Sequence, residues 1–174
     1  LANGYGIYFP NGSNFNTIIN SSASSISSHA IYLNSSSNNM VIRSNGTSNS
    51  SNGIYIYLGS NNTIINSNGT SNSSNGIYIN SSSNNTLINS NGTSKSGSGI
   101  RISSGSSNNS IVNSIGFSNS SNGIYIDLSS NNTILNSTGI SISSFAIYLD
   151  NSPQNTIINS NGTSASGSGI HIIS

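Results

Sequence analysis

The chain has 174 residues, of which 91 are Ser, Asn or Thr and only five are charged. The charged fraction is 3%, against about 25% in ordinary globular domains, and the net charge of +1 argues against the basic surface that nucleic acids need. There is no cysteine for disulfides or thiolate metal sites, and no apolar run approaches the roughly 18 residues of a membrane-spanning helix. We therefore expect no nucleic-acid partner and no membrane span.

A short motif, a small residue followed by Ile, recurs every 23 or 24 residues along the whole chain. The small residues are Gly6, Ala30, Gly53, Gly76, Gly99, Gly123, Ala146 and Gly169. Such a period is typical of a solenoid, in which each coil buries its apolar face against its neighbours. The sequence predicts one domain over residues 1–174 with about seven coils.

The first expected strand of each coil alternates inward and outward residues. Two apolar columns, represented by Ile54 and Ile56, flank an outward column, which is typical of a β-strand. The outward column contains Tyr8, Tyr32, Tyr55, Tyr78, Tyr125 and Tyr148. This aromatic stripe is a candidate contact surface for a sugar or for another chain. Arg101 and His171 replace Tyr in the same column, and we expect both to be solvated strand residues.

The second expected strand has the form Asn-Thr-Ile-Ile-Asn. We expect the first of its two apolar residues to face inward, with a bulge as the alternative that would bury part of both. An Asn precedes the strand in every coil: Asn16, Asn39, Asn62, Asn85, Asn109, Asn132 and Asn155. Side-chain amides stacked about 4.8 Å apart can form an Asn ladder, and Asn also tolerates the turn conformation expected there.

A third short strand is expected near the Gly-Thr-Ser segments. Three short strands and three turns account for 23 residues, and no segment has the 3.6-residue period of a helix. The fold class predicted is all-β, a parallel β-helix solenoid with three short strands per coil.

The segment NNTIINSNGTSNSSNGIYI resembles the repeat of right-handed parallel β-helix proteins of the NosD-like group, which abound among archaeal and bacterial surface and periplasmic proteins. The resemblance covers essentially the whole chain and implies right-handed winding. The same fold also serves pectate lyases, polygalacturonases, phage tailspikes and adhesins, so the resemblance does not specify a function.

Few residues are suited to catalysis. The chain has two Asp and no Glu, and Asp127 and Asp150 occupy one column in adjacent coils, about 5 Å apart. Such a pair could serve a retaining glycosidase or a Ca²⁺ site, but no further acid completes either arrangement. We expect both to be surface residues beside a turn, and His29 to be without a metal-binding partner. The sequence predicts no catalytic residue, no metal site and no cofactor.

Sixteen Asn-x-Ser/Thr sequons occur, where chance predicts about 11 from the composition. One column of candidate glycosylation sites contains Asn45, Asn68, Asn91 and Asn161, and a second contains Asn49, Asn72 and Asn119. Glycans would solubilise a surface that lacks charge repulsion.

These features favour a glycosylated, non-catalytic structural protein of the cell surface or of a filament, located outside the cell. Neither terminal segment carries a cap, so we expect either a longer repeat protein or protomers that stack end to end. A carbohydrate-binding adhesin and a polysaccharide lyase or hydrolase are alternatives. An ice-binding solenoid is a further alternative, suggested by a column that is mostly Thr: Thr17, Met40, Thr63, Thr86, Ser110, Thr133 and Thr156. A paired Thr-x-Thr rank is missing, because Ile or Asn occupies the companion positions.

Overall fold

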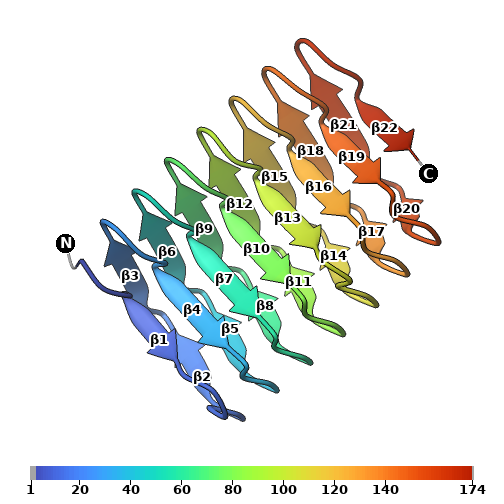
Figure 1. Cartoon of the computed structure of the whole chain (residues 1–174). Helices are drawn as coiled ribbons and strands as arrows, with labels where there is room; N and C mark the ends of the chain where they lie inside the picture. The colour runs from blue at the N-terminus through green and yellow to red at the C-terminus, as the bar shows by residue number, and fades with distance from the viewer. Residues whose placement is uncertain (1–2, 174) are drawn as a thin grey trace.

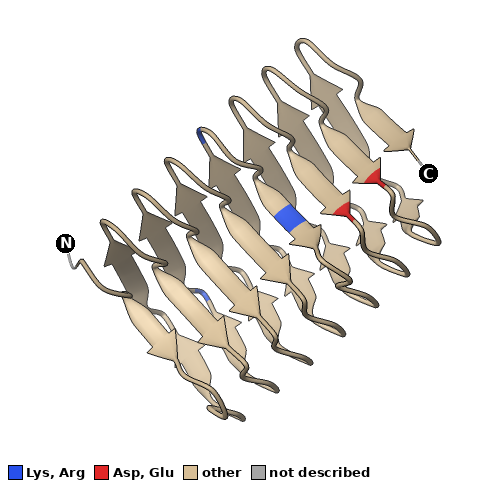
Figure 2. Ribbon diagram, viewed as in Figure 1, with Lys and Arg blue, Asp and Glu red and all other residues tan. Residues whose placement is uncertain are grey.

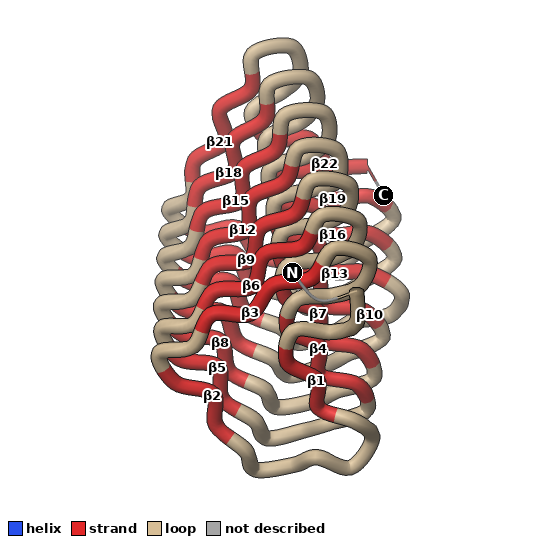
Figure 3. The backbone as a smooth tube through the Cα atoms, turned by 90° about the vertical axis from the view of Figure 1, so that its left-hand side faces the viewer, coloured by secondary structure: helices blue, strands red, loops and turns tan. Residues whose placement is uncertain are grey.

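A computed structural model describes residues 3–173 of the chain. Within these residues the chain forms strands and no helix, and the strands form three parallel sheets that run side by side along one axis (Figure 1). We number the sheets in the order in which each coil visits them. The tube representation shows the coils stacked directly on one another (Figure 3).

Sheet 1 contains β1 (Ile7–Phe9), β4 (Ile31–Asn34), β7 (Ile54–Tyr57), β10 (Ile77–Asn80), β13 (Ile100–Ser103), β16 (Ile124–Asp127), β19 (Ile147–Asp150) and β22 (Ile170–Ile173). Sheet 2 contains β2 (Thr17–Ile19), β5 (Met40–Ile42), β8 (Thr63–Ile65), β11 (Thr86–Ile88), β14 (Ser110–Val112), β17 (Thr133–Leu135) and β20 (Thr156–Ile158). Sheet 3 contains β3 (Ser22–Ser25), β6 (Asn45–Ser48), β9 (Asn68–Ser71), β12 (Asn91–Ser94), β15 (Ile115–Ser118), β18 (Thr138–Ser141) and β21 (Asn161–Ser164).

The strands pair in register with the sequence repeat. Ile77 of β10 lies opposite Ile54 of β7 on one side and Ile100 of β13 on the other. Sheet 1 has eight strands, and sheets 2 and 3 have seven each. The described chain therefore makes seven coils and the first strand of an eighth, which confirms the predicted all-β solenoid.

The predicted apolar columns form the core. Ile54 and Ile56 of sheet 1 and Ile64 of sheet 2 are completely buried, as are their equivalents in the other central coils. The apolar columns become exposed to solvent at the last strand, where Ile170 and Ile172 are 44% and 62% exposed. These two residues differ from the prediction because no described strand lies beyond β22 to cover them.

Sheet 2 settles which of its two apolar columns faces inward. Ile64 and Leu87 are buried, whereas Ile65 and Ile88, one residue later, lie half-exposed on the outside. Plain alternation therefore holds, and the first column is the inward one, as favoured from the sequence. The third strand also lies where the Gly-Thr-Ser segments predicted it.

The corners between strands explain much of the Asn content. Each complete coil turns through residues with positive φ, such as Asn61 (57°) before sheet 2 and Asn66 (50°) after it. Among the described residues, twelve of the 20 non-glycine residues with positive φ are Asn. Because Asn reaches the left-handed region at lower cost than most residues, a coil with several such corners selects for it.

Sheets 1 and 3 approach each other closely through small residues. A Cβ added to Gly69 of sheet 3 would meet the backbone oxygen of Gly76, and one added to Gly76 would meet the backbone nitrogen of Thr93. Both contacts would be closer than real Cβ atoms show. The small residue at the start of every repeat is therefore needed for this packing.

Candidate functional site

The Asn column before sheet 2 forms a continuous hydrogen-bonded ladder along the inside of the solenoid. The backbone N–H of Asn62 donates to Asn85 Oδ1 at 2.8 Å, and Asn62 Nδ2 donates to the same oxygen at 3.1 Å. Asn85 repeats both bonds to Asn109. The backbone-to-Oδ1 bond joins each successive pair from Asn16 to Asn155. These amides hold adjacent coils together and leave no reactive group free.

Serine forms further ladders that the sequence analysis missed. The backbone N–H of Ser44 donates to Ser67 Oγ at 3.0 Å, and that of Ser67 donates to Ser90 Oγ at 3.2 Å. A second ladder includes the bond from Ser82 N–H to Ser106 Oγ at 3.0 Å. The signal in the sequence is an unbroken column after the second strand: Ser21, Ser44, Ser67, Ser90, Ser114, Ser137 and Ser160. In residues 3–173 no buried side-chain nitrogen or oxygen lacks a partner.

The aromatic stripe on the outer face of sheet 1 is a stack of rings. Tyr32 and Tyr55 lie 5.1 Å apart between ring centroids with a 13° interplanar angle, and Tyr125 and Tyr148 lie 5.0 Å apart at 4°. Tyr78 continues the first stack at 5.1 Å from Tyr55. Since each ring covers the face of the next, the stripe presents mainly ring edges and hydroxyls to the outside.

The start of the stripe is more enclosed than predicted. Tyr32 is only 8% exposed, although its column faces outward. The rings of Tyr5 and Tyr8 lie 5.1 and 5.3 Å from it, and that of His29 lies at 4.8 Å. The neighbouring aromatic side chains bury this residue, which strand alternation alone does not predict.

The side chains of the stripe also contact the next coil diagonally. Asn80 Nδ2 donates to Tyr55 Oη at 3.0 Å, and Tyr125 Oη donates to Asp150 Oδ2 at 3.2 Å. Burial, followed by the charges of Asp127 and Asp150, raises the pKa of Tyr125 to about 12. The hydroxyl therefore stays protonated at neutral pH and serves as a donor.

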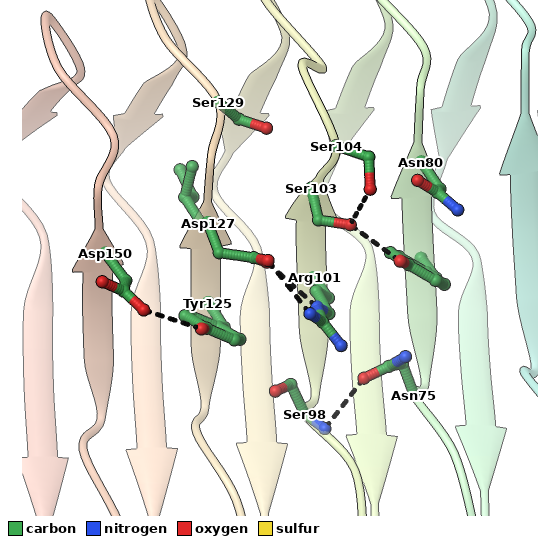
Figure 4. A network of polar contacts seen from close by, with 12 residues as sticks. Asn75, Asn80, Ser98, Arg101, Ser103, Ser104, Tyr125, Asp127, Ser129 and Asp150 are labelled. Carbon is green, nitrogen blue, oxygen red and sulfur yellow. Dashed lines mark hydrogen bonds and ion pairs between the residues drawn. The ribbon is translucent and has the colours of Figure 1, made fainter.

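Arg101 takes the place of a ring in the stack; it is half-exposed on the outward column of β13, as expected, but paired instead of freely solvated. Its guanidinium carbon lies 5.5 Å from the ring centroid of Tyr78 and 5.1 Å from that of Tyr125. Its Nε and Nη2 each donate to one oxygen of Asp127 at 3.0 Å (Figure 4). A planar cation held by two rings and a bidentate carboxylate replaces the Tyr geometry closely.

The two carboxylates occupy adjacent strands, in the column that the sequence predicted. Asp127 of β16 pairs with Asp150 of β19. Asp127 is buried beside Arg101, which differs from the surface position expected, whereas Asp150 is half-exposed and also accepts from Asn151 Nδ2 at 2.9 Å. Charged residues are sparse over the rest of the described chain (Figure 2). Residues 3–173 contain no group of three or more His, Cys, Asp or Glu that could hold a metal ion.

His29 lies at the corner before β4 as a neutral acceptor. Ser51 Oγ lies 2.7 Å from its Nδ1, and the backbone N–H of Asn52 donates to Nδ1 at 3.3 Å. The ring also packs 4.5 Å from Tyr55. Burial lowers the pKa of His29 to about 4. His171, at the other end of the stripe, stacks on Phe145 with ring centroids 4.2 Å apart.

The candidate glycosylation sites lie on the outside. In the first column Asn45, Asn68 and Asn161 are exposed and Asn91 is half-exposed; in the second, Asn49 and Asn72 are exposed and Asn119 is half-exposed. Neighbouring amides pair, with Asn68 Nδ2 donating to Asn45 Oδ1 at 2.9 Å and Asn72 Nδ2 to Asn49 Oδ1 at 2.7 Å. A third sequon column that the sequence analysis did not single out lies exposed at a positive-φ corner: Asn61, Asn84, Asn108 and Asn131.

Solved structures show the same fold with little sequence identity. A crystal structure of the periplasmic alginate epimerase AlgG matches with a TM-score of 0.63 and 15% identity, over 98% of this chain and 42% of that one. The A-module of the Azotobacter vinelandii mannuronan C-5 epimerase AlgE4 matches with a TM-score of 0.52 and 14% identity, over 91% and 55% of the two chains. At these identities the likeness concerns the fold alone.

The search of curated proteins finds no match. In residues 3–173 no helix is long and apolar enough to cross a membrane. The family model described as "right handed beta helix region" matches residues 2–138 and 30–174, and together these two matches cover nearly the whole chain. With its three parallel sheets and in-register coils, the chain belongs to the right-handed β-helix family.

Proposed function

We propose that this chain is a non-catalytic structural part of an extracellular surface protein or filament. The observation that carries the proposal is that buried Asn and Ser side chains bond from coil to coil, as Asn62 does to Asn85 and Ser44 to Ser67. Bonds in this direction stabilise a long, regular rod. In residues 3–173 every buried side-chain nitrogen and oxygen has a hydrogen-bond partner, so none is left free for chemistry.

The reactive side chains support the same proposal. Arg101 and Asp127 bind each other, and Tyr125 binds Asp150. His29 accepts a hydrogen bond from the backbone N–H of Asn52 in the next coil. These are contacts of a packed surface, and the proposal includes neither a catalytic residue nor a cofactor.

Mannuronan is the informative substrate for the test, because one protein with this fold is named a mannuronan C-5 epimerase. The pure protein should leave the composition of mannuronan unchanged in an NMR assay. Conversion that the double variant Arg101→Tyr, Asp127→Asn abolishes would overturn the non-catalytic proposal.

The stacked geometry favours a structural role for the aromatic stripe over a sugar platform. A sugar ring packs on an exposed aromatic face, whereas the faces of Tyr55 and Tyr125 are turned toward neighbouring rings. In the adhesin alternative the stripe would act through its hydroxyl edges. Titration with neutral and acidic oligosaccharides should show no saturable change in tyrosine fluorescence; a saturable change would favour the adhesin.

Glycosylation is part of the proposal because sequon side chains such as Asn45, Asn72 and Asn161 lie outside. Coils about 4.8 Å apart are too close for a glycan on every member of one column. We therefore expect partial occupancy, spaced along the columns. Mass spectrometry of proteolytic peptides from the native protein should show glycan masses on peptides that contain these sequons, and sequon peptides at their bare masses would remove this element.

The proposed location is outside the cytoplasm, within the NosD-like group of surface and periplasmic β-helices. Support comes from the repeat resemblance and from the fold shared with AlgG, which is described as periplasmic. Labelling of intact cells of the source with an antibody against the chain would test the location, and signal only after lysis would contradict it.

We further propose that more coils cover the open edges of β1 and β22. Ile170 and Ile172 are exposed on β22, and an uncovered strand edge attracts another strand. The covering coils belong either to a longer repeat chain, of which residues 1–174 form one domain, or to a second protomer stacked end to end. Electron microscopy should show thin fibres, whereas discrete particles with different structures over both edges would contradict the proposal.

A further inference from the structure

The outward face of sheet 2 consists of two parallel ranks of side chains. The first rank is Thr17, Met40, Thr63, Thr86, Ser110, Thr133 and Thr156; the second is Ile19, Ile42, Ile65, Ile88, Val112, Leu135 and Ile158. The ranks are in register, with Thr63 opposite Thr86 and Ile65 opposite Ile88. A row of hydroxyls, interrupted at Met40, thus runs beside a row of aliphatic side chains.

The threonine hydroxyls of this face have no protein partner, unlike the hydroxyls of the ladder serines. Ladder serines such as Ser67 and Ser90 donate to backbone carbonyls. Among the described residues, Thr163 on sheet 3 is the one threonine whose hydroxyl takes part in a hydrogen bond. The hydroxyls of Thr63, Thr86 and Thr133 therefore remain available to water.

The two ranks are held rigidly. Thr, Ile and Val fill the ranks except at Met40, Ser110 and Leu135. These β-branched side chains are restricted at χ1, so their outward atoms repeat with little variation. Behind the face, Ile64 and Leu87 are completely buried, and the Asn and Ser ladders bound each strand at its two ends. None of the residues in the two ranks is charged.

We infer that this face binds the surface of ice. Its groups repeat about every 4.8 Å along the axis and about every 6.8 Å across it, distances of the order of the repeats on the faces of hexagonal ice. Free hydroxyls can hold lattice waters, while the Ile rank leaves neighbouring waters no competing partner. Liquid water has no matching period, so a rigid array of this kind favours the ordered phase.

The other two faces lack this combination of properties. On sheet 1 the hydroxyls of Tyr55 and Tyr125 are already bonded, and Arg101 introduces a charge. On sheet 3 the hydroxyls of Thr70 and Thr93 also have no protein partner, but apolar residues of β15 and β18 interrupt the Asn–Thr ranks in the middle of the face: Ile115, Phe117 and Ile140. On sheet 2 the hydroxyl rank is interrupted once, by Met40 near one end. Sheet 2 is therefore the face that we assign to ice, a function separate from the structural role proposed above.

The test compares two matched double variants with the unmodified chain. Thr86→Lys with Thr133→Lys places charges on sheet 2, and Thr70→Lys with Thr93→Lys makes the same change on the half-exposed outer face of sheet 3. The unmodified chain should facet growing ice crystals and become enriched in a slowly growing ice hemisphere. The sheet 2 variant should lose both effects, and the sheet 3 variant should keep them.

Circular dichroism and thermal unfolding verify that each variant folds. Should the sheet 2 double variant fail to fold, Thr86→Val, which removes a hydroxyl but keeps the shape, should still weaken faceting. The inference is overturned by an unmodified chain without effect on ice or by equal losses in both double variants. It is also overturned if the sheet 2 variant changes only the oligomeric state in sedimentation, because that result would make the face a protein contact.

Discussion

At the scale of single residues, a buried amide in this protein holds two coils at once. Asn85 Oδ1 accepts from Asn62 in the preceding coil, while Asn85 Nδ2 donates to Asn109 in the following coil and to the carbonyl of Gly59 at 2.9 Å. Because the site is fully buried, water cannot replace these bonds when the side chain is removed.

We expect Asn85→Ala to lower the free energy of unfolding by about 1–3 kcal/mol, because the N–H of Asn62 and the carbonyl of Gly59 lose their partner. The adjacent Asn84→Gly is the control, since Asn84 is exposed with φ 59° and glycine adopts that conformation freely. Urea unfolding of the two variants measures the difference, and equal effects would contradict the structural importance of the ladder.

His29 makes stability depend on pH. Its pKa in the folded chain is about 4, below the ordinary value of 6.5, because burial disfavours the charged ring. Between these pH values the unfolded chain takes up a proton that the folded chain does not, so the free energy of unfolding falls as pH falls through this window. We expect a loss of about 1–2 kcal/mol, reduced by the partial exposure of the ring.

The variant His29→Asn should flatten this pH dependence between about pH 6.5 and 4, since Asn52 and Asn75 occupy the same column in later coils. The remaining titratable groups are common to both proteins, so the difference between their melting temperatures isolates His29. Parallel pH profiles of the two proteins would show that His29 is not the cause.

At the scale of elements, strands of sheet 1 are joined by diagonal side-chain pairs as well as by backbone bonds. Tyr55 with Asn80 and Arg101 with Asp127 are two versions of one contact, from an outward residue to a residue two positions further along in the next coil. A charged pair has thus replaced a neutral pair without changing the register of the strands.

We expect Asp127→Asn alone to destabilise the chain by about 1–2 kcal/mol, because it leaves the half-buried guanidinium of Arg101 without its counter-charge. Adding Arg101→Tyr should restore most of the loss, since the double variant recreates the pair seen at Tyr55 and Asn80. Chemical unfolding of the single and double variants measures this coupling, and additive effects would contradict it.

At the scale of the whole molecule, stability depends on position along the axis. A central coil contacts a coil on each side, whereas the strand β22 is covered on one side only within the described chain. Ile77 and Ile170 occupy equivalent columns, yet Ile77 is completely buried and Ile170 is 44% exposed.

Ile77→Ala should therefore cost about 2–5 kcal/mol, the range for buried aliphatic residues truncated to Ala. Ile170→Ala should cost roughly half as much, because this residue is already 44% exposed and loses less buried surface. Thermal unfolding by circular dichroism compares the two. A large effect at Ile170 would show that further coils or a second protomer cover β22.

The sequence by itself determined the coils, because each depends on local alternation and on a strict period. Ile54 and Ile56 defined the first strand and its inward face, Asn85 occupied a column that repeats in every coil, and the 23-residue spacing placed Asp127 beside Asp150. The right-handed winding followed from the family resemblance, and the family model agrees with it.

Only the tertiary structure decided the contacts that cross coils diagonally or depend on the stacking of large side chains. Strand alternation placed Arg101 and Tyr32 outside, yet neighbouring rings bury Tyr32 and flank the half-exposed Arg101. Asp127 is buried by its pairing with Arg101. Likewise, Thr86 and Ser90 are both short polar residues in the sequence, yet the hydroxyl of Thr86 is free and that of Ser90 is hydrogen-bonded. Their roles differ because one points to solvent and the other toward a backbone carbonyl of its coil stack.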